Sequence, residues 1–415
     1  MKLNEYNAVK EYLRELIKDT EFNNKVFCVG GCCRDAILGD DIKDIDIVIE
    51  LPNGGVHFAE WLRDNEHTKG AIVTYPTYGT SKFTLDKFPH IEIEAVHTRS
   101  EKYLDRSSRN PSTDYGTIKE DCMRRDLTIN AIYCNVSTDE YIDVCGNSLM
   151  DIRHHIIRTP SDPEITYNDD PLRILRCVRF ASRYGWAIEA KTYASMKNNI
   201  DRLSIISAER ITDEFNKIIG NSDIDKSFHG LSYLNDIGAF RYIFTDVDIN
   251  LSLMSSPLLS DIKKRIVVLL YESSNTNELL ISRKYSNAFI RDILMLTRLS
   301  KQWGYMFDSL DCPIFESLCR QFQYDCGSEE VLNDVLDIIR VINPSLDEVI
   351  QTMPKGINHY GYKLPVNGGD IMKHFNIPSG PLIKQCLDYL INVSFSNPDI
   401  SANECYEKIE PFIKL

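Results

Sequence analysis

The sequence predicts an α+β protein with a mixed α/β head, followed by an all-helical neck, body and tail. Between Val26 and about Ile157, short β-branched or aromatic segments alternate with helical stretches. After Pro160 the strand signals nearly vanish, and amphipathic helices follow one another. A chain of 415 residues is long enough for two to four domains, each with its own core.

The head begins with an amphipathic helix over residues 1–20. Short strand-like segments follow it, and each either alternates apolar with polar residues or stays apolar. In chain order they are FCVGG, IDIVIE, AIVTY, SKFTLD, HIEIEAVH, AIYCNV and EYIDVCG. Helical stretches, such as the one after Arg34, separate some of the strands and give the head its mixed character.

Helices dominate the rest of the chain. Clear examples of the helical period are DPLRILRCVRFASRY, AERITDEFNKII, DIKKRIVVLLYE, FIRDILMLTRLSKQW and EEVLNDVLDIIRVI. From the change in pattern we predict a head over 1–158, a helical neck over 159–220, and a helical body and tail over 221–415.

Composition sets the broad class. Hydrophobic residues make up 43% and charged residues 26% of the chain, which is typical of a soluble globular protein. No apolar run approaches the roughly 20 residues that span a bilayer, and the charged start is unlike a signal peptide. We therefore expect a cytoplasmic protein whose twelve cysteines are mostly buried free thiols. The net charge of −14 argues mildly against a nucleic-acid partner, although phosphate binding needs only local positive charge.

Asp44 and Asp46 stand two residues apart in the apolar run DIDIVIE. In a strand this spacing directs both carboxylates to one face, where they repel each other unless a cation lies between them. Mg²⁺ takes carboxylate oxygens and often bridges them to nucleotide phosphates. An isolated D-x-D is more often a solvated strand end, but the apolar neighbours favour a metal site here.

Gly30 and Gly31 end the strand VFCVG and precede a helix that opens near Arg34. Glycines let a backbone approach phosphate closely, and a helix N-terminus offers N–H groups and a positive dipole. Arg34 can then hold a triphosphate oxygen. A Gly-Gly pair alone is usually a turn, so the prediction depends on the aspartates of the next strand.

The stretch DCMRRDLTINAIY carries Arg124, Arg125 and Asp126, with Asn130 four residues further on. An arginine there can bind phosphate, and the Asp or Asn can hydrogen-bond ribose hydroxyls. A surface cluster of ion pairs is the equally simple alternative.

The stretch DDPLRILRCVRF places Asp170, Arg173, Arg176 and Arg179 three residues apart along one side of a helix. Three arginines without a lysine favour planar, bidentate recognition over a merely solvated face. A carboxylate beside a guanidinium matches the amino group and ring nitrogen of cytosine and adenine. The same pair mismatches uracil and guanine, so we expect selection of CTP and ATP.

These motifs resemble one family, the class II tRNA nucleotidyltransferases (CCA-adding enzymes) and the bacterial poly(A) polymerases related to them. GGCCRD with DIDIVI is similar to the family's first motif, and RRDLTINAIY to its ribose-contacting motif. DVCGNSLMDIRHHIIR resembles the connection to the neck, DDPLRILRCVRF the base-reading motif, and SAERITDEFNKII the neck motif after it. Five ordered motifs cover about the first half of the chain, and GGDIMKHFNIPSGPLI is similar to a tail segment.

The resemblance implies a polymerase-β-like nucleotidyltransferase head, a base-recognising neck and a tRNA-binding body and tail. It assigns catalysis and Mg²⁺ to Asp44 and Asp46. The nucleotide-binding residues that we expect are Gly30, Gly31, Arg34, Arg125, Asp126, Asn130, Asp170, Arg173, Arg176 and Arg179. Glu94 is either a further carboxylate on the metal-facing sheet or a solvated strand residue.

One position departs from the family pattern, because Asp169 stands where the base-reading motif usually opens with Glu. The shorter side chain puts the orientation of Arg173, and with it the change from C to A addition, in question. Candidate tRNA contacts in the body, each of which a solvated helix face also explains, are Lys263, Lys264, Arg265, Arg283, Lys284, Arg291 and Arg298.

The predicted activity is untemplated addition of C, C and A to the 3′ end of tRNA from CTP and ATP by two-metal chemistry. A poly(A) polymerase, or a partial enzyme that adds only CC or only A, is the alternative within the same family. The segment Ser100–Asp121 resembles the loop of full CCA-adding enzymes and favours the first prediction. A catalytically silent RNA-binding protein is a remote alternative, because both aspartates are present.

Overall fold

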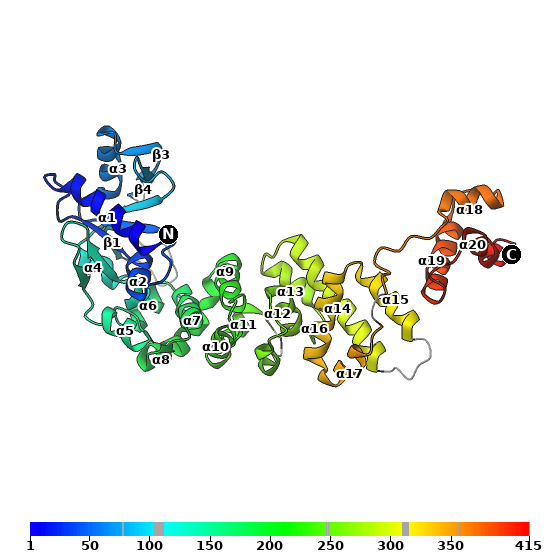
Figure 1. Ribbon diagram of the computed structural model, residues 1–415. Helices are drawn as coiled ribbons and strands as arrows, with labels where there is room; N and C mark the ends of the chain where they lie inside the picture. The colour runs from blue at the N-terminus through cyan, green and yellow to red at the C-terminus, as the bar shows by residue number, and fades with distance from the viewer. Residues whose placement is uncertain are drawn as a thin grey trace. The chain divides into compact units, whose positions relative to one another are not determined.

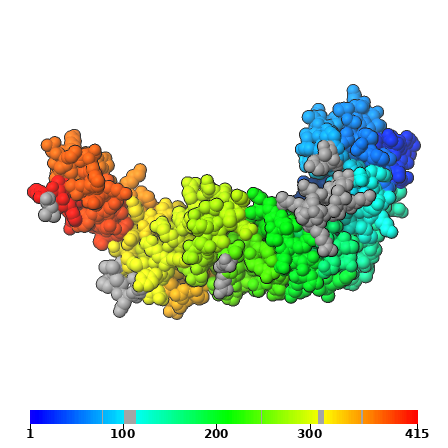
Figure 2. Space-filling view, turned by 180° about the vertical axis from the view of Figure 1, so that it is seen from behind, coloured from blue at the N-terminus to red at the C-terminus, as the bar shows by residue number. Residues whose placement is uncertain are grey.

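The computed structural model describes residues 1–76, 79–102, 112–245, 247, 249–308, 315–354 and 357–414. These residues form two compact units, Met1–Asp246 and Val247–Leu415, coloured blue to green and yellow-green to red in Figures 1 and 2. The predicted head and neck both belong to the first unit, and the three-part division of the chain stays a prediction. Residues 103–111 of the predicted loop lie outside the described residues.

A seven-stranded mixed sheet forms the centre of the head, in the order β3-β4-β5-β2-β1-β8-β9. β1 runs antiparallel to both β2 and β8, whereas β2 and β5 are parallel. Each strand coincides with one of the apolar or alternating segments expected from the sequence. The strands are β1 (Val26–Val29), β2 (Ile45–Ile49), β3 (Thr68–Tyr75), β4 (Thr80–Leu85), β5 (Glu92–His97), β8 (Ile132–Asn135) and β9 (Tyr141–Asp143).

Helices follow the strands and pack against them. The chain opens with α1 (Leu3–Ile17), as expected, and α2 (Gly31–Leu38) follows β1 directly and contacts β1, β2 and β8. α3 (Gly54–Asp64) lies on β2, β3, β4 and β5. Gly55 makes this close approach feasible, because a Cβ there would lie 2.4 Å from the carbonyl oxygen of Gly79.

The short helix α4 (Ile118–Met123) covers part of the sheet through an apolar cluster that joins Cys122 to Phe27, Val29, Val48 and Tyr133. The strands β6 (Arg99–Lys102) and β7 (Ser112–Tyr115) pair beside it. The polar side chains of β2, β4 and β5 that carry the candidate site are not members of this apolar cluster. The 3₁₀ helix η2 (Thr128–Asn130) and α5 (Ser148–His154) complete the head.

At the end of the predicted head, the strand β10 (Ile156–Ile157) pairs in parallel with β11 (Ala187–Ile188) of the predicted neck. Between these strands lie α6 (Pro163–Asp169) and α7 (Leu172–Tyr184). On α7, Ile174, Leu175, Cys177 and Val178 are buried while the arginines are half-buried, which confirms the predicted faces. The helices that follow are α8 (Ala190–Asn199), η3 (Ile200–Ile205), α9 (Ala208–Ile219), α10 (Ile224–Asp236) and α11 (Phe240–Ile243), of which α9 and α10 pack on α7.

The second unit is helical in its described part. Its first half packs α14 (Asn287–Asp308) against α12 (Ile262–Leu269) and α16 (Glu329–Ile342). The remaining elements there are η4 (Leu251–Ser255), α13 (Thr276–Ser282), α15 (Phe315–Cys326), η5 (Pro344–Leu346) and α17 (Asp347–Gln351). Three helices, α18 (Gly368–Phe375), α19 (Pro381–Ser396) and α20 (Ala402–Ile413), share a separate apolar cluster at the C-terminal end.

Two of the cationic residues expected to contact tRNA are buried inside this unit. Lys264 is 4% exposed and pairs with Asp337 and Asp334, and Arg265 is 1% exposed and donates to the carbonyl oxygen of Leu259. Lys263 is ion-paired with Asp292. The expectation of an RNA contact is therefore wrong for Lys264 and Arg265, because their charges serve the interior of the helical unit.

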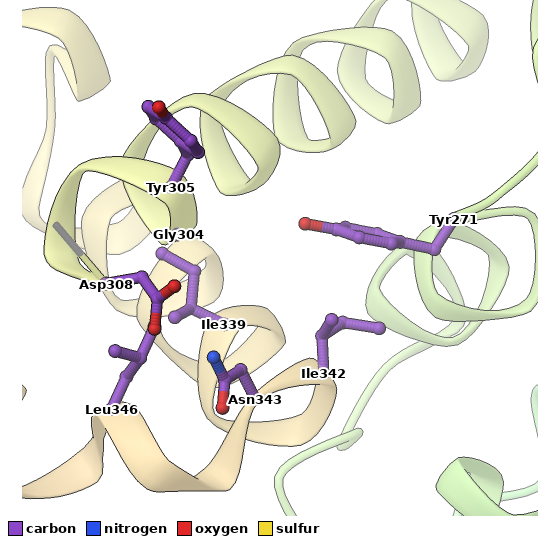
Figure 3. Close-up of a pocket in the computed structure, with 8 residues that line it drawn as sticks. All are labelled: Tyr271, Gly304, Tyr305, Asp308, Ile339, Ile342, Asn343 and Leu346. Carbon is purple, nitrogen blue, oxygen red and sulfur yellow. The ribbon is translucent and has the colours of Figure 1, made fainter.

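A cavity of about 180 Å³ lies beside α14 and α16, and Tyr271, Tyr305, Ile339, Ile342 and Leu346 are among the residues that line it (Figure 3).

Among the described helices, none is both long and apolar enough to cross a membrane.

Candidate functional site

The two aspartates of the DIDIVIE stretch lie together in one recess at the start of β2. Ile45 and Ile47 point into the core, whereas Asp46 points to the opposite, exposed face, as the period of two requires. Asp44, Asp46 and Glu94 line the same cavity, which has a volume of about 180 Å³. The sequence analysis placed the aspartates on one face correctly, and Asp46 and Glu94 are direct neighbours across the parallel pair β2–β5.

The recess crowds like charges. Its partial burial, together with the nearby Cys32 and Glu94, raises the pKa of Asp46 to about 7, although Arg125 opposes this shift. Lys82, which the sequence analysis did not single out, lies across from Glu94 on β4 and pairs with it at 3.0 Å. The alternating pattern of SKFTLD predicts that Lys82 lies on the polar face of a strand. That this strand lies beside Glu94 does not follow from the sequence, because it depends on the strand order.

These residues fit a divalent cation that is shared with a bound substrate. Asp44 and Asp46 offer carboxylate oxygens to one recess, and burial first, then nearby negative charge, raises the pKa of Asp46; a bound cation would favour its ionised form. Within the described ranges no group of three or more His, Cys, Asp or Glu side chains is arranged to hold a metal alone. Mg²⁺ commonly takes one or two protein carboxylates and completes its octahedron with water and phosphate oxygens, which this arrangement allows.

The glycines beside the aspartates shape the start of α2. Gly30 has φ of +75° at the N-terminal end of the helix, in the left-handed region that favours glycine. A Cβ on Gly30 would lie 3.5 Å from Nη1 of Arg125, so this guanidinium reaches the helix start. The first N–H groups of α2 and the charge of Arg125 together favour an anion here.

Arg34 has partners that differ from the expected phosphate. It is 4% exposed, its Nε donates to Asp35 at 2.8 Å, and its Nη1 donates to Asn130. The guanidinium also lies 5.2 Å from the ring centre of Phe180 and 5.6 Å from that of Tyr184, both on α7. Arg34 thus connects the start of α2 to the neck helix.

Asp126 links the head to the neck through opposite charges. Its Oδ2 accepts from Arg176 at 2.8 Å, and its Oδ1 accepts from Asn130 at 3.1 Å. Burial opposes ionisation of this carboxyl, but Arg176 and Asn130 more than offset it and lower its pKa to about 2. The structure therefore brings Arg34, Asn130, Asp126 and Arg176 into one connected network.

Glu214 on α9 extends this network and was missed by the sequence analysis. It is 3% exposed, lies 2.7 Å from Nε of Arg179 and 4.0 Å from Nη1 of Arg176. Burial raises the pKa of Glu214 and lowers that of Arg179, and the charge of each residue opposes the shift of the other. Its place in AERITDEFNKII, on the buried side of an amphipathic helix, was the available signal.

Asp170 occupies the break between α6 and α7, two residues before the helix that was expected to include it. Its Oδ1 accepts from the N–H of Leu172 at 3.1 Å, and its Oδ2 pairs with Arg210 of α9 at 3.0 Å. Arg173 donates to the carbonyl oxygen of Thr166 and also helps to lower the pKa of Asp126. Asp170 and Arg173, the expected base-reading pair, thus lie at the start of α7, with Arg173 near Asp126.

A second cavity adjoins Asp46 and Glu94 on the side of α4. It has a volume of about 280 Å³, and Arg99, Arg124 and Arg125 line it. The sequence suggested a role for Arg124 but not for Arg99. The two side chains line one cavity only because β6 packs beside α4, which the sequence does not reveal.

Family models match two segments of the chain. Residues 26–158 match the model described as Poly A polymerase head domain. Residues 185–249 match the model described as Probable RNA and SrmB- binding site of polymerase A.

Curated relatives extend the likeness over most of the chain. A CCA-adding enzyme of Staphylococcus aureus (strain MRSA252) is 28% identical over 389 residues, which cover 90% of each chain. The mitochondrial CCA tRNA nucleotidyltransferase of Saccharomyces cerevisiae is 35% identical over 207 residues, or 46% of this chain and 37% of that one.

Solved structures share the fold. The CCA-adding enzyme of Bacillus stearothermophilus in complex with CTP superposes with a TM-score of 0.72 at 21% identity, covering 98% of both chains. The Thermotoga maritima enzyme complexed with tRNA gives a TM-score of 0.70 at 20% identity, covering 99% of this chain and 96% of that one. The head model and the curated relatives support a nucleotidyltransferase. The two family models and the curated relatives all point to the family of class II CCA-adding enzymes and related poly(A) polymerases.

Proposed function

We propose that this protein is a CCA-adding enzyme, which adds C, C and A to the 3′ end of tRNA from CTP and ATP and releases pyrophosphate. The observation that carries the proposal is the recess of Asp44, Asp46 and Glu94 beside the glycine-led helix α2. It occurs in a chain that matches CCA-adding enzymes along 90% of its length.

In this proposal Asp44 and Asp46 hold Mg²⁺ together with the phosphates of the nucleotide. When bound there, Mg²⁺ neutralises charge on the triphosphate and makes the RNA 3′-hydroxyl a better nucleophile. The N–H groups at the start of α2 and the guanidinium of Arg125 would hold the phosphates that leave as pyrophosphate. The acceptor hydroxyl attacks the α-phosphorus in line with that leaving group.

The neck would select the base and set its position. Asp170 and Arg173 at the beginning of α7 present an acceptor and donors that match cytosine and adenine. Arg176 and Arg179, fixed by Asp126 and Glu214, would maintain the distance between the base-reading helix and the phosphates. In this arrangement Arg34 and Asn130 act as supports, because their side chains are committed to Asp35 and Asp126.

The direct test supplies the purified protein and Mg²⁺ with a tRNA transcript that ends at the discriminator base. Each nucleotide is given singly, then CTP with ATP, and products are resolved to one nucleotide. We expect two additions with CTP alone and a stop at three with the mixture. No extension under any condition would contradict the proposal.

The matching head model also describes poly(A) polymerases, so this activity is the second candidate. A long ladder with ATP alone would establish it in the same experiment. A stop after CC would instead indicate a partial enzyme and would direct attention to Asp169.

A further inference from the structure

The cavity lined by Arg99, Arg124 and Arg125, which we name the arginine cavity, has a floor of opposite charge. Asp46 and Glu94 lie on the sheet below, with Val29 and Val96 beside them. The volume of about 280 Å³ is several times the roughly 30 Å³ that one water occupies in the liquid. A cationic wall beside the catalytic carboxylates suits an anion that must lie close to the reacting atoms.

A buried carboxylate fixes two of the three guanidinium groups. Asp121 has no exposed side-chain surface, and it pairs with Arg125 at 2.9 Å through one oxygen and with Arg124 through the other. Tyr133 donates to the same carboxylate at 2.7 Å. Burial raises the pKa of Asp121, but Arg125, Arg124 and Tyr133 hold it well below its usual range.

The third arginine, Arg99, joins this wall through its backbone. Nε of Arg124 donates to the carbonyl oxygen of Arg99 at 3.2 Å, and the N–H of Arg99 points to Asp121 at 3.4 Å. The guanidinium groups of Arg124 and Arg125 are therefore preorganised, and binding an anion there costs little ordering of these two side chains.

The arginine cavity lies outside the set of residues proposed for the nucleotide. Of the ten residues expected from the sequence to bind the nucleotide, only Arg125 lines it. Arg125 also reaches Gly30 at the start of α2, so it marks the boundary between the two regions. In an in-line reaction the attacking and leaving oxygens lie on opposite sides of the α-phosphorus. Since we propose that the pyrophosphate leaves toward the start of α2, the acceptor RNA is expected on the opposite side of Asp46.

We infer that the arginine cavity binds the last phosphodiester of the acceptor RNA and so holds its 3′-hydroxyl beside Asp46 and Glu94. This inference rests on the proposed function and extends it to a substrate contact. Arg99 and Arg124 are the binding residues, and Asp121 is a positioning residue that acts through them. A phosphodiester has one negative charge whatever the sequence, so the same contact serves before each of the three additions.

The test is a cycle between the protein and the RNA backbone. A two-piece tRNA is prepared with either a normal or an uncharged methylphosphonate group at its last linkage, and kcat/KM for the first C addition is measured at saturating CTP. For the parent we expect the methylphosphonate to cost about 10- to 100-fold, the range for a charged hydrogen bond. In Arg99→Gln and in Arg124→Gln the normal RNA loses a similar factor. Within each variant, replacing the normal linkage by the methylphosphonate is expected to lower kcat/KM by less than a further factor of about three.

Three comparisons keep the outcome decisive. KM for CTP at saturating RNA stays within about twofold of the parent in both variants if the contact is to the acceptor. Arg63→Gln, which removes an exposed arginine paired with Asp64, leaves both substrates' constants unchanged. Arg99→Gln leaves the pairs of Asp121 intact and remains informative if Arg124→Gln fails to fold.

The inference would be overturned if the methylphosphonate lowered kcat/KM by the same factor in the variants as in the parent. A rise in KM for CTP without a change for the RNA would overturn it as well. A parent that extends both RNAs equally well would overturn it too, while leaving the proposed function intact. A parent that extends neither RNA would contradict the proposed function itself.

Discussion

Two charged regions of the first unit treat their carboxylates in opposite ways. At the start of β2, Asp44, Asp46 and Glu94 share one recess, and the pKa of Asp46 is raised to about 7. Between head and neck, Asp126 pairs with Arg176 and its pKa is lowered to about 2. Both aspartates are near the reaction that we propose, yet among the described residues only Asp126 is ion-paired with a cationic side chain.

The difference indicates what each region is for. Like charges that nearby cations neutralise only in part, as Lys82 and Arg125 do in the recess, represent unfavourable energy that a bound ion can relieve, so the recess is arranged to bind a cation. Opposite charges that already satisfy each other have no such need, and their contribution is to fix the position of one element against another. The first region is expected to govern turnover, and the second to govern stability and alignment.

The largest effect should come from the recess. Asp44→Ala or Asp46→Ala is expected to lower nucleotide incorporation by on the order of 10³-fold or more, because a metal-holding carboxylate is lost. Thermal stability should not fall, since each change removes a like charge. Single-turnover incorporation and thermal denaturation measure the two effects. Activity at the parent rate would show that the metal assignment is wrong.

In the head–neck network we expect a substitution to reduce stability clearly and activity only moderately. Asp126→Asn leaves Arg176 without its carboxylate, and we expect a loss of about 2 kcal/mol in the free energy of unfolding, after allowing for the partial exposure of Arg176. Activity should fall about tenfold through poorer alignment. Urea denaturation at neutral pH gives the stability change. An unchanged stability would remove the contrast between the two regions.

The same variant has a pH signature. Because the pKa of Asp126 is about 2 when folded and ordinarily about 3.9, its contribution is complete above pH 4 and is lost as the pH falls toward 2. The parent should therefore lose more stability than Asp126→Asn over that window. Parallel curves for the two proteins would contradict the lowered pKa.

A smaller effect is expected on nucleotide choice. Asp170→Asn exchanges an acceptor for a mixed donor and acceptor at the proposed base-reading position, so discrimination of CTP against UTP should fall about tenfold. The ratio of kcat/KM values for the two nucleotides reports this change. Glu209→Gln, on the first turn of α9, is a matched control that should leave the ratio unaltered.

The smallest effect concerns the recess without metal. Because the pKa of Asp46 is raised, the folded state holds its proton more tightly than the unfolded state, and stability should decline as pH rises from about 4 to 7. Asp46→Asn removes this decline. Since Asp46 is partly exposed, we expect a gain of only about 1 kcal/mol at pH 8 in EDTA. A variant that is less stable than the parent at pH 8 would argue against charge crowding.

Local patterns were sufficient to predict the strands and the common face of the aspartates. IDIVIE alternates and is β-branched, so its position in a sheet and the direction of Asp46 follow from the sequence alone. The neighbours of Asp46 do not follow, because Glu94 and Lys82 reach it only through the strand order β4-β5-β2. That order is decided by tertiary packing and not by any one segment.

Long charged side chains were harder to predict than apolar ones. Lys264 lies in a stretch that suggested RNA contacts, but it is buried and paired inside the protein. Arg34 is also buried and pairs with Asp35, and its contact with phosphate stays a prediction. The spacing of Arg173, Arg176 and Arg179 gave their shared helix face correctly, whereas their partner Glu214 came from a helix far along the chain. The helical period predicts which side faces solvent, and a single sequence does not contain the identity of an ionic partner.

The two-residue pairing of β10 with β11 has a consequence for cutting and recombining this protein. The N–H of Ala187 donates to His155, that of Glu189 donates to Ile157, and the ring of His155 stacks on Trp186. The backbone therefore forms a closed loop that begins in the last segment of the head and contains the whole base-reading helix. A chimera joined at residue 158 would open that loop, so an exchange of nucleotide preference between relatives requires junctions outside residues 155–189.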